Sequence, residues 1–114
     1  ANLFQLCDQL ILDIDGTETD GAHAITQLNH LRAITAQAIE VAQQPTGATT
    51  LSAIAGDYLR LTHLALMGWA WRRIRAAIEA DDPRWADQDR ALKSWVLPEF
   101  NMRLTIIQTQ FASP

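Results

Sequence analysis

The sequence predicts an all-α fold, and three observations carry this prediction. Apolar residues recur at steps of three and four along most of the chain, which is the period of an amphipathic helix. Glycine occurs only 5 times in 114 residues, mostly between these periodic segments. No alternating run bounded by turn residues indicates a strand. We therefore expect one domain, residues 1–114, folded as an antiparallel four-helix bundle.

Each of the first two predicted helices has one apolar stripe. The first stripe runs from Leu3 to Ile14, and Gly16 is expected to end that helix. Asp20 is the expected N-cap of the second helix. The turn residues 44–47 end the second helix after a stripe formed by Ile25, Leu28, Leu31, Thr35, Ala38 and Ala42.

The third predicted helix is apolar on two sides. We expect it to run from a cap at Thr49 or Thr50 to about Ala80. Trp69 and Trp71 point about 200° apart around it, at 100° per residue. One stripe is formed by Leu61, Ala65 and Trp69, and the other by Leu59, Leu66, Ala70 and Ile74. Such a helix needs neighbours on two sides, so we expect it to be long and largely buried.

Gly68 lies inside this third helix. A glycine in a helix interior costs about 1 kcal/mol relative to alanine unless close packing recovers it. Its position predicts either the close approach of a neighbouring backbone or space for a tryptophan ring.

The fourth predicted helix follows the break at residues 81–83, with Asp82 as its cap and Pro83 at its first position. Pro98 cannot donate a hydrogen bond to the carbonyl of Ser94, so we expect a kink there. The stripe continues past the proline and comprises Trp85, Leu92, Val96, Phe100, Leu104, Ile107 and Phe111.

Composition excludes several classes of protein. The net charge is −4, which argues against a nucleic-acid partner. Cys7 is the only cysteine, so no intrachain disulfide or thiolate zinc cage is possible, and we expect a cytoplasmic protein. The longest apolar run, 64–71, is far shorter than the roughly 20 residues that span a membrane. Because no Met stands at position 1, we expect a fragment of a longer protein.

One motif resembles a catalytic template. Residues 10–17 resemble the nucleophile motif of haloacid dehalogenase-type phosphatases, in which Asp13 would attack phosphorus and Asp15, before Gly16, would act as acid and base. That chemistry needs the carboxyl end of a strand in a parallel sheet, which this helical sequence does not supply. An acidic helix end is therefore the favoured interpretation, and the phosphatase is kept as an alternative.

Two rows of polar residues have the composition of ligand sites. His23 and His30 are about 10 Å apart along a helix, too far to share a metal ion, and we expect them on the surface. Asp57, Arg60 and His63 could bind an anion or a partner, but a solvated rim or an ion pair within the helix is the commoner arrangement. The sequence therefore predicts no metal site.

Three segments carry a family resemblance: residues 56–61 (Gly-Asp-Tyr-Leu-Arg-Leu), 68–72 (Gly-Trp-Ala-Trp-Arg) and 97–99 (Leu-Pro-Glu). In order and approximate spacing they resemble the C-terminal accessory helical domain of bacterial acyl-CoA dehydrogenases. The resemblance implies a parent enzyme that uses FAD to remove hydrogens from the α and β carbons of an acyl-CoA thioester. The catalytic base and the flavin site would belong to the preceding body, so no catalytic, cofactor-binding or metal-binding residue is assigned here.

The resemblance implies that this segment packs against the catalytic body of the same parent chain or against a second subunit, with a homo-oligomer expected. The flanking tryptophans suggest that at least one of them serves such a contact. A free-standing helical protein-interaction module remains an alternative. The candidate packing or interface residues are Tyr58, Arg60, Gly68, Trp69, Trp71, Arg72 and Pro98.

Overall fold

The computed structural model describes residues 2–14, 19–77 and 82–112, and in these ranges it is helical without strands. The all-α prediction is confirmed for this part of the chain. The elements are α1 (Leu3–Leu12), α2 (Thr19–Ala42), α3 (Gly47–Ala76), α4 (Pro83–Ala91), the π-helical segment η1 (Leu92–Val96) and α5 (Leu97–Ala112).

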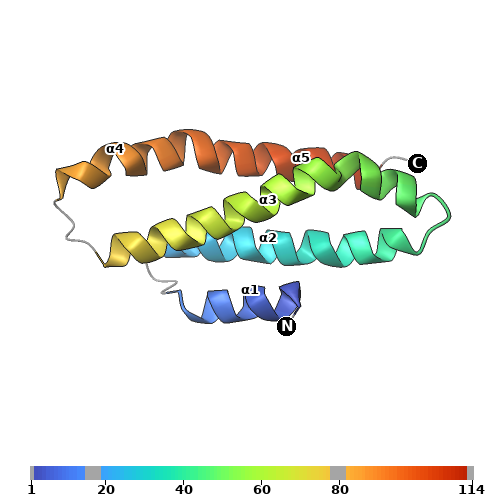
Figure 1. Ribbon diagram of the computed structural model, residues 1–114, viewed down its shortest axis with the longest axis horizontal. Coiled ribbons are helices and arrows are strands. Elements are labelled where there is room, and N and C mark those ends of the chain that lie inside the picture. Colours follow the sequence, from blue (N-terminus) through green and yellow to red (C-terminus); the bar gives the residue numbers. More distant parts are fainter. Residues whose placement is uncertain (1, 15–18, 78–81, 113–114) are drawn as a thin grey trace.

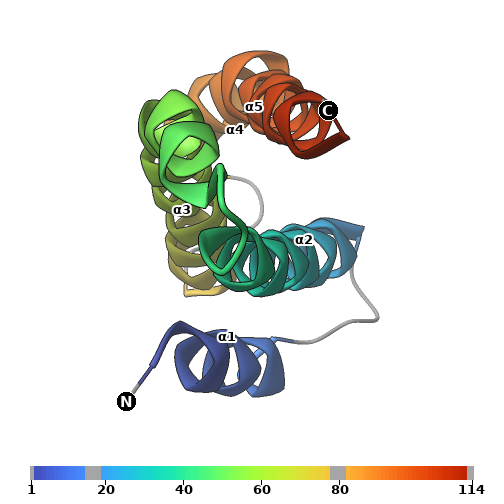
Figure 2. The same ribbon diagram turned by 90° about the vertical axis from the view of Figure 1, so that its right-hand side faces the viewer.

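The helices form an elongated molecule of 54 × 27 × 19 Å. The chain reverses direction after α2, so that α3 runs back beside it, and reverses again before α4 (Figure 1). Viewed along the long axis, α2, α3 and α5 lie at the corners of a triangle, and α1 lies on the other side of α2 from α5 (Figure 2). The third helix therefore has neighbours on two sides.

The core lies inside the triangle of α2, α3 and α5. Cys7 is 1% exposed and joins this core from α1. The residues at its centre are the largest fully buried side chains: Leu28, Leu31, Ile34, Ile54, Leu61, Leu64, Phe100 and Ile107. All except Ile34, Ile54 and Leu64 belong to the stripes identified in the sequence.

Two of the predicted N-caps are wrong. α2 begins at Thr19, so Asp20 lies inside its first turn. α3 begins at Gly47, so Thr49 and Thr50 also lie inside the helix. The tight 43–46 turn needs a glycine at this start, because a Cβ on Gly47 would stand only 2.1 Å from the carbonyl oxygen of Val41.

The other helix ends agree with the sequence in part. Asp82 caps α4 as predicted, since its Oδ1 accepts a hydrogen bond from the backbone N–H of Arg84 at 3.0 Å. α1 ends at Leu12, before the predicted stop at Gly16, which lies outside the described residues. α3 is helical to Ala76, and the rest of its predicted length, residues 78–80, also lies outside them.

The predicted disturbance at Pro98 takes the form of the π-helical segment η1. The backbone N–H of Leu97 donates to the carbonyl of Leu92, five residues back. A π turn carries one residue more than an α turn, so it changes the direction of every side chain that follows. The proline itself lies two residues after η1, as the second residue of α5.

Candidate functional site

The candidate site is an exposed apolar surface on α3. Leu61, Leu64 and Ala65 are fully buried. Leu59, Met67 and Ile74, in contrast, are 71%, 36% and 44% exposed. At 100° per residue these three fall within about 80° of one another, over a length of about 22 Å. We call Leu59, Met67 and Ile74 the open face of α3. The apolar circumference of this helix is thus only partly covered within the chain.

A groove between α2 and α3 adjoins the open face. Its volume is about 520 Å³, and its lining contains no charged residue. Leu59 belongs to both surfaces, and Ile39 on the α2 side is 48% exposed. The polar group in the groove is already paired, because the hydroxyl of Tyr58 shares a hydrogen bond of 2.6 Å with Thr35. The groove is lined by Thr35, Ala38, Ile39, Ala42, Leu51, Ile54, Ala55, Tyr58 and Leu59.

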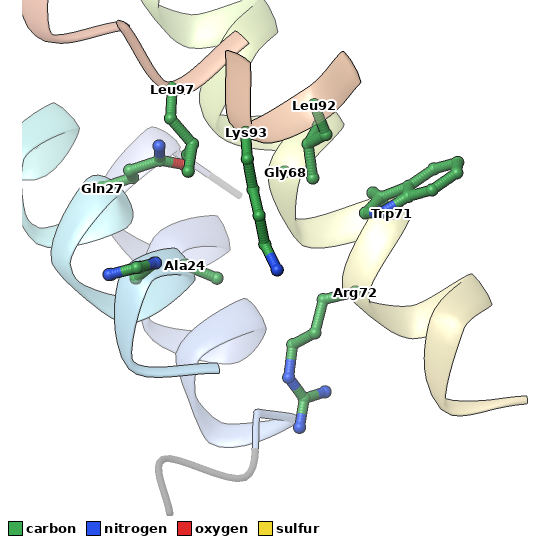
Figure 3. A pocket seen from close by; sticks show the side chains of 9 residues that line it. Ala24, Gln27, Gly68, Trp71, Arg72, Leu92, Lys93 and Leu97 are labelled. Carbon is green, nitrogen blue, oxygen red and sulfur yellow. The ribbon is translucent and has the colours of Figure 1, made fainter. Parts of the chain in front are cut away.

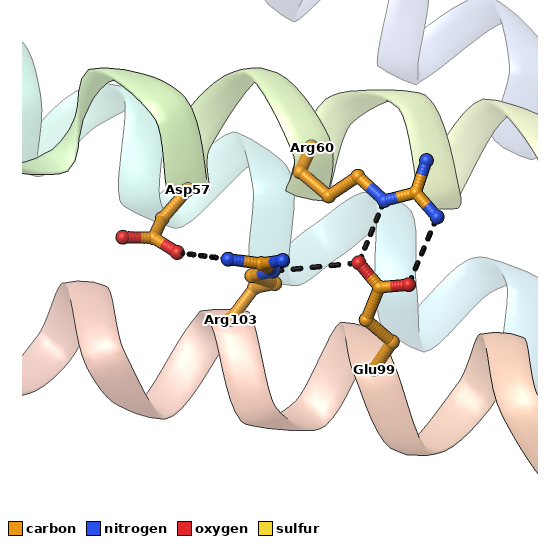
Figure 4. Close-up of polar contacts among 4 residues, drawn as sticks. All are labelled: Asp57, Arg60, Glu99 and Arg103. Atoms are coloured by element: carbon orange, nitrogen blue, oxygen red, sulfur yellow. Dashed lines mark hydrogen bonds and ion pairs between the residues drawn. The ribbon is translucent and has the colours of Figure 1, made fainter.

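A four-residue ionic network joins the other side of α3 to α5 (Figure 4). The guanidinium of Arg60 donates two hydrogen bonds to the carboxylate of Glu99, at 2.6 and 2.9 Å. Arg103 bridges the acids, donating to Asp57 at 2.7 Å and to Glu99 at 3.4 Å. Two cations and two anions balance, so the formal charge of the network is zero.

The network fixes Glu99 in its charged form. The hydrogen bonds from Arg60 lower the pKa of the Glu99 carboxyl to about 2. A group this acidic is a poor proton acceptor near neutral pH. Glu99 therefore acts as a tie between helices, and Arg60 is engaged in it rather than open to an external anion.

The two indoles that flank Gly68 both have neighbours inside the chain. The ring of Trp71 lies 4.8 Å from that of Trp85, centroid to centroid, at an angle of 55°. Its Nε1 donates to Asp89 at 3.5 Å. Trp69 packs against the core, and the guanidinium of Arg73 lies 5.7 Å from its ring centroid. Neither indole is bare to solvent.

Gly68 makes room for a side chain that the sequence analysis did not single out. An added Cβ would stand 2.9 Å from Oε1 of Gln27, and no backbone atom of another helix and no atom of Trp71 lies nearer. The predicted close approach of a neighbouring backbone is therefore wrong. Figure 3 shows Gln27 reaching from α2 toward Leu97, and both residues line the small void beside Gly68.

The remaining predicted residues are scattered. Arg72 lines the void beside Gly68, whereas Pro98 is exposed on α5. His23 and His30 lie on the surface, as predicted. Asp13 follows a helix rather than a strand and lies 3.8 Å from Arg73, while Asp15 and Gly16 of the phosphatase-like motif lie outside the described residues.

Within the part of the chain that the structure describes, neither a metal-binding group nor a membrane-spanning helix is present. No three side chains of the metal-binding types gather in a group that could hold an ion. No described helix combines the length and the apolar character needed to cross a membrane.

No family model, curated protein or solved structure matches this chain.

Proposed function

We propose that this chain is a noncatalytic helical packing module, the C-terminal domain of an FAD-dependent acyl-CoA dehydrogenase. Its open face would dock on the catalytic body of the same parent chain or on a second subunit of a cytoplasmic homo-oligomer. The parent enzyme would bind FAD and acyl-CoA outside this segment. The four long helical stretches would then act as one antiparallel bundle.

The exposure of the open face carries the packing role. Burying a leucine or isoleucine side chain contributes about 1.5–3 kcal/mol relative to leaving it in water. Leu59, at 71% exposed, and Ile74, at 44%, retain much of this free energy for a contact outside the chain. The adjoining groove has no charged lining that would oppose such a contact.

The assignment to a flavoenzyme rests on the three motif segments. The first two, residues 56–61 and 68–72, lie on α3 and include Leu59 of the open face. The third, residues 97–99, supplies Glu99, which the network ties to Arg60 of the first segment. The first and third resembling segments are thus in contact, and the first supplies one residue of the proposed docking surface.

The complete reading frame of the gene tests the enzyme part of the proposal. We expect its product to be a yellow flavoprotein that absorbs near ~450 nm and oxidises acyl-CoA thioesters, because the cofactor supplies this chemistry. A reading frame that begins within the first codons of the printed sequence would contradict it.

The second candidate, a free-standing interaction module, is favoured by the same open face. It predicts that the 114-residue chain associates with itself. Sedimentation velocity should then show a dimer that Leu59→Asp converts to a monomer. Ala53→Asp is the matched control, because Ala53 is also exposed on α3 but lies about 120° away from Leu59. A chain that is monomeric at every concentration would contradict this candidate.

A further inference from the structure

The groove between α2 and α3 continues the surface on which α1 packs. Arg32 of α2 contacts α1, because its guanidinium lies 5.1 Å from the ring centroid of Phe4 and 3.2 Å from the carboxylate of Asp8. Ile39, which lines the groove, follows Arg32 by seven residues. It is therefore two turns further along α2 and only about 20° around it. α1 and the groove occupy successive stretches of the same side of α2.

The same relation holds on α3. The carboxylate of Asp13, just after α1, lies 3.8 Å from the guanidinium of Arg73. Leu59, which lines the groove, is about 21 Å from Arg73 along α3 and only about 40° around it. Figure 1 shows α1 beside one half of α2, with its N-terminal end toward the other half. One side of the α2–α3 pair is thus covered by a helix at one end and open at the other.

α1 shows which kind of segment this side accepts. It is an amphipathic helix, since Cys7 and Leu10 are 1% and 9% exposed while polar side chains such as Gln5 lie on the surface. A capping box closes its first turn. Oδ1 of Asn2 accepts from the backbone N–H of Gln5 at 2.9 Å, and Oε1 of Gln5 accepts from the backbone N–H of Asn2 at 3.3 Å. α1 therefore begins at Leu3, and a helix in the groove is a separate one.

The described side chains that line the groove offer no hydrogen-bond donor. Oγ1 of Thr35 donates its one proton to the carbonyl of Leu31 at 2.8 Å. Tyr58 is therefore the donor in the 2.6 Å bond between the two hydroxyls. The other lining side chains are apolar. An extended peptide would bring backbone carbonyls that these side chains cannot satisfy, whereas a helix satisfies its own.

We propose that the groove receives an amphipathic helix of the body on which the open face docks, laid end to end with α1. The inference rests on the proposed docking role and adds the form of the partner: apolar residues at steps of three and four, with no charge on the side toward the groove. The groove runs along α2 from Thr35 to Ala42, about 10 Å, which is room for two turns of that helix.

A helical peptide tests this chemistry on the 114-residue chain. The probe is a synthetic peptide of residues 2–14 with Cys7→Ala, held helical by a covalent staple on its polar side, because α1 already fits this side of the α2–α3 pair. We expect it to shift the NMR signals of Ala38 and Ala55, which line the groove. Ala38→Glu places a charge in the groove and should weaken peptide binding by roughly tenfold or more. Ala36→Glu is the matched control, since Ala36 is exposed on α2 and lies about 200° away from Ala38.

Four results would overturn the proposal. The first two are the absence of any shift and shifts confined to Arg32 and the other residues that α1 covers. The third is equal weakening by the two glutamate variants. The fourth is a dimer of the chain alone that Ala38→Glu dissociates, since a second copy would then be the occupant. The backbone spectrum of each variant reports whether it is folded, so a loss of structure is not mistaken for a loss of binding.

Thiol labelling in the product of the complete gene separates this proposal from the docking role itself. We expect Ala38→Cys to react much more slowly than Ala36→Cys in that protein. Slow labelling of a cysteine at position 59 together with fast labelling at position 38 would reject the helix in the groove and leave the docking of the open face intact. Fast labelling at both positions would reject both.

Discussion

At the scale of single residues, the main electrostatic feature is the pairing of the Glu99 carboxylate with two arginines. The carboxylate accepts three hydrogen bonds from two arginines on different helices. The pKa of the carboxyl falls to about 2 because the charged form is stabilised in the folded chain. Its contribution to stability is therefore fully present above its unfolded value near 4.5 and is lost as the pH falls toward 2.

Glu99→Gln tests this linkage. The variant should be less stable than the unaltered chain at pH 7, and the difference should shrink as the pH is lowered from about 4.5 toward 2. Urea denaturation at several pH values measures it. Asp87→Asn is the control, because the Asp87 and Arg90 side chains are 85% and 73% exposed and their pairing contributes little. A pH-independent loss in Glu99→Gln would contradict the account.

The two glycines inside α3 make a second residue-scale comparison. Gly56→Ala should raise the free energy of unfolding by about 1 kcal/mol, because alanine has the higher helix propensity and the new methyl group meets nothing. Gly68→Ala should gain less, since the same propensity is offset by displacement of the Gln27 amide. Equal gains in chemical denaturation would show that the amide is not held against Gly68.

At the scale of elements, η1 solves a register problem that the sequence contains. Leu92, Val96, Phe100 and Leu104 are spaced four apart, and 12 residues make about 3.3 α-helical turns. On a regular helix Leu104 would therefore point about 120° away from Leu92. The additional residue of the π turn absorbs most of this drift, so that Val96 packs against the core together with the buried Phe100 and Leu104.

Single-residue deletions test this interpretation. The deletions are made in a Pro98→Ala background, because proline clashes with a regular helix. In that background, deletion of the exposed Ser94 should convert η1 to α-helix and lower the free energy of unfolding by less than about 1 kcal/mol. Deletion of the equally exposed Asn101 is the contrast, because it rotates Leu104 and Ile107 out of the core by about 100°. Losing each of these buried contacts costs about 2–5 kcal/mol. Similar costs for the two deletions would contradict the register argument.

How much of the structure the sequence could predict differs between helix positions, helix ends and contacts between helices. Helix positions followed from apolar periodicity, since burial of one stripe stabilises each helix. Helix starts were harder to predict: Gly47, the first residue of α3, lies against the carbonyl of Val41, and this contact depends on the fold of the turn. The pairs Arg60–Glu99 and Arg103–Asp57 join α3 to α5, so their formation depends on how two helices are placed against each other.

Gln27 was missed although the sequence held a signal. It lies between Ala24 and Leu28 in the buried stripe of α2, where a polar residue is unusual. The sequence indicated an apolar stripe on α3 that contains Leu59 and Ile74, but it could not show that this stripe is exposed. The two apolar sides of α3 differ in their neighbours. α4 covers the side that carries Trp71, whereas the open face lies outside the triangle of helices.

At the scale of the whole molecule, α2, α3 and α5 enclose the core while one side of α3 remains apolar and open. Trp71 and Trp69 are covered within the chain, so the docking role falls to Leu59, Met67 and Ile74. These three side chains share one side of α3 with the exposed His63, and exposed apolar surface bordered by polar residues marks interaction sites in folded proteins. Trp95, which is 75% exposed on η1, lies outside this surface.

The rate of thiol labelling at position 59 in the product of the complete gene tests this central claim most directly. Cys7 is 1% exposed, so within residues 1–114 the reagent should report on the introduced cysteine, and the labelling of the unaltered product is subtracted. We expect Leu59→Cys to react much more slowly than Ala53→Cys in that protein, because a body or subunit covers the open face. Equal, fast labelling at both positions would mean that nothing docks there, and the packing function would be wrong.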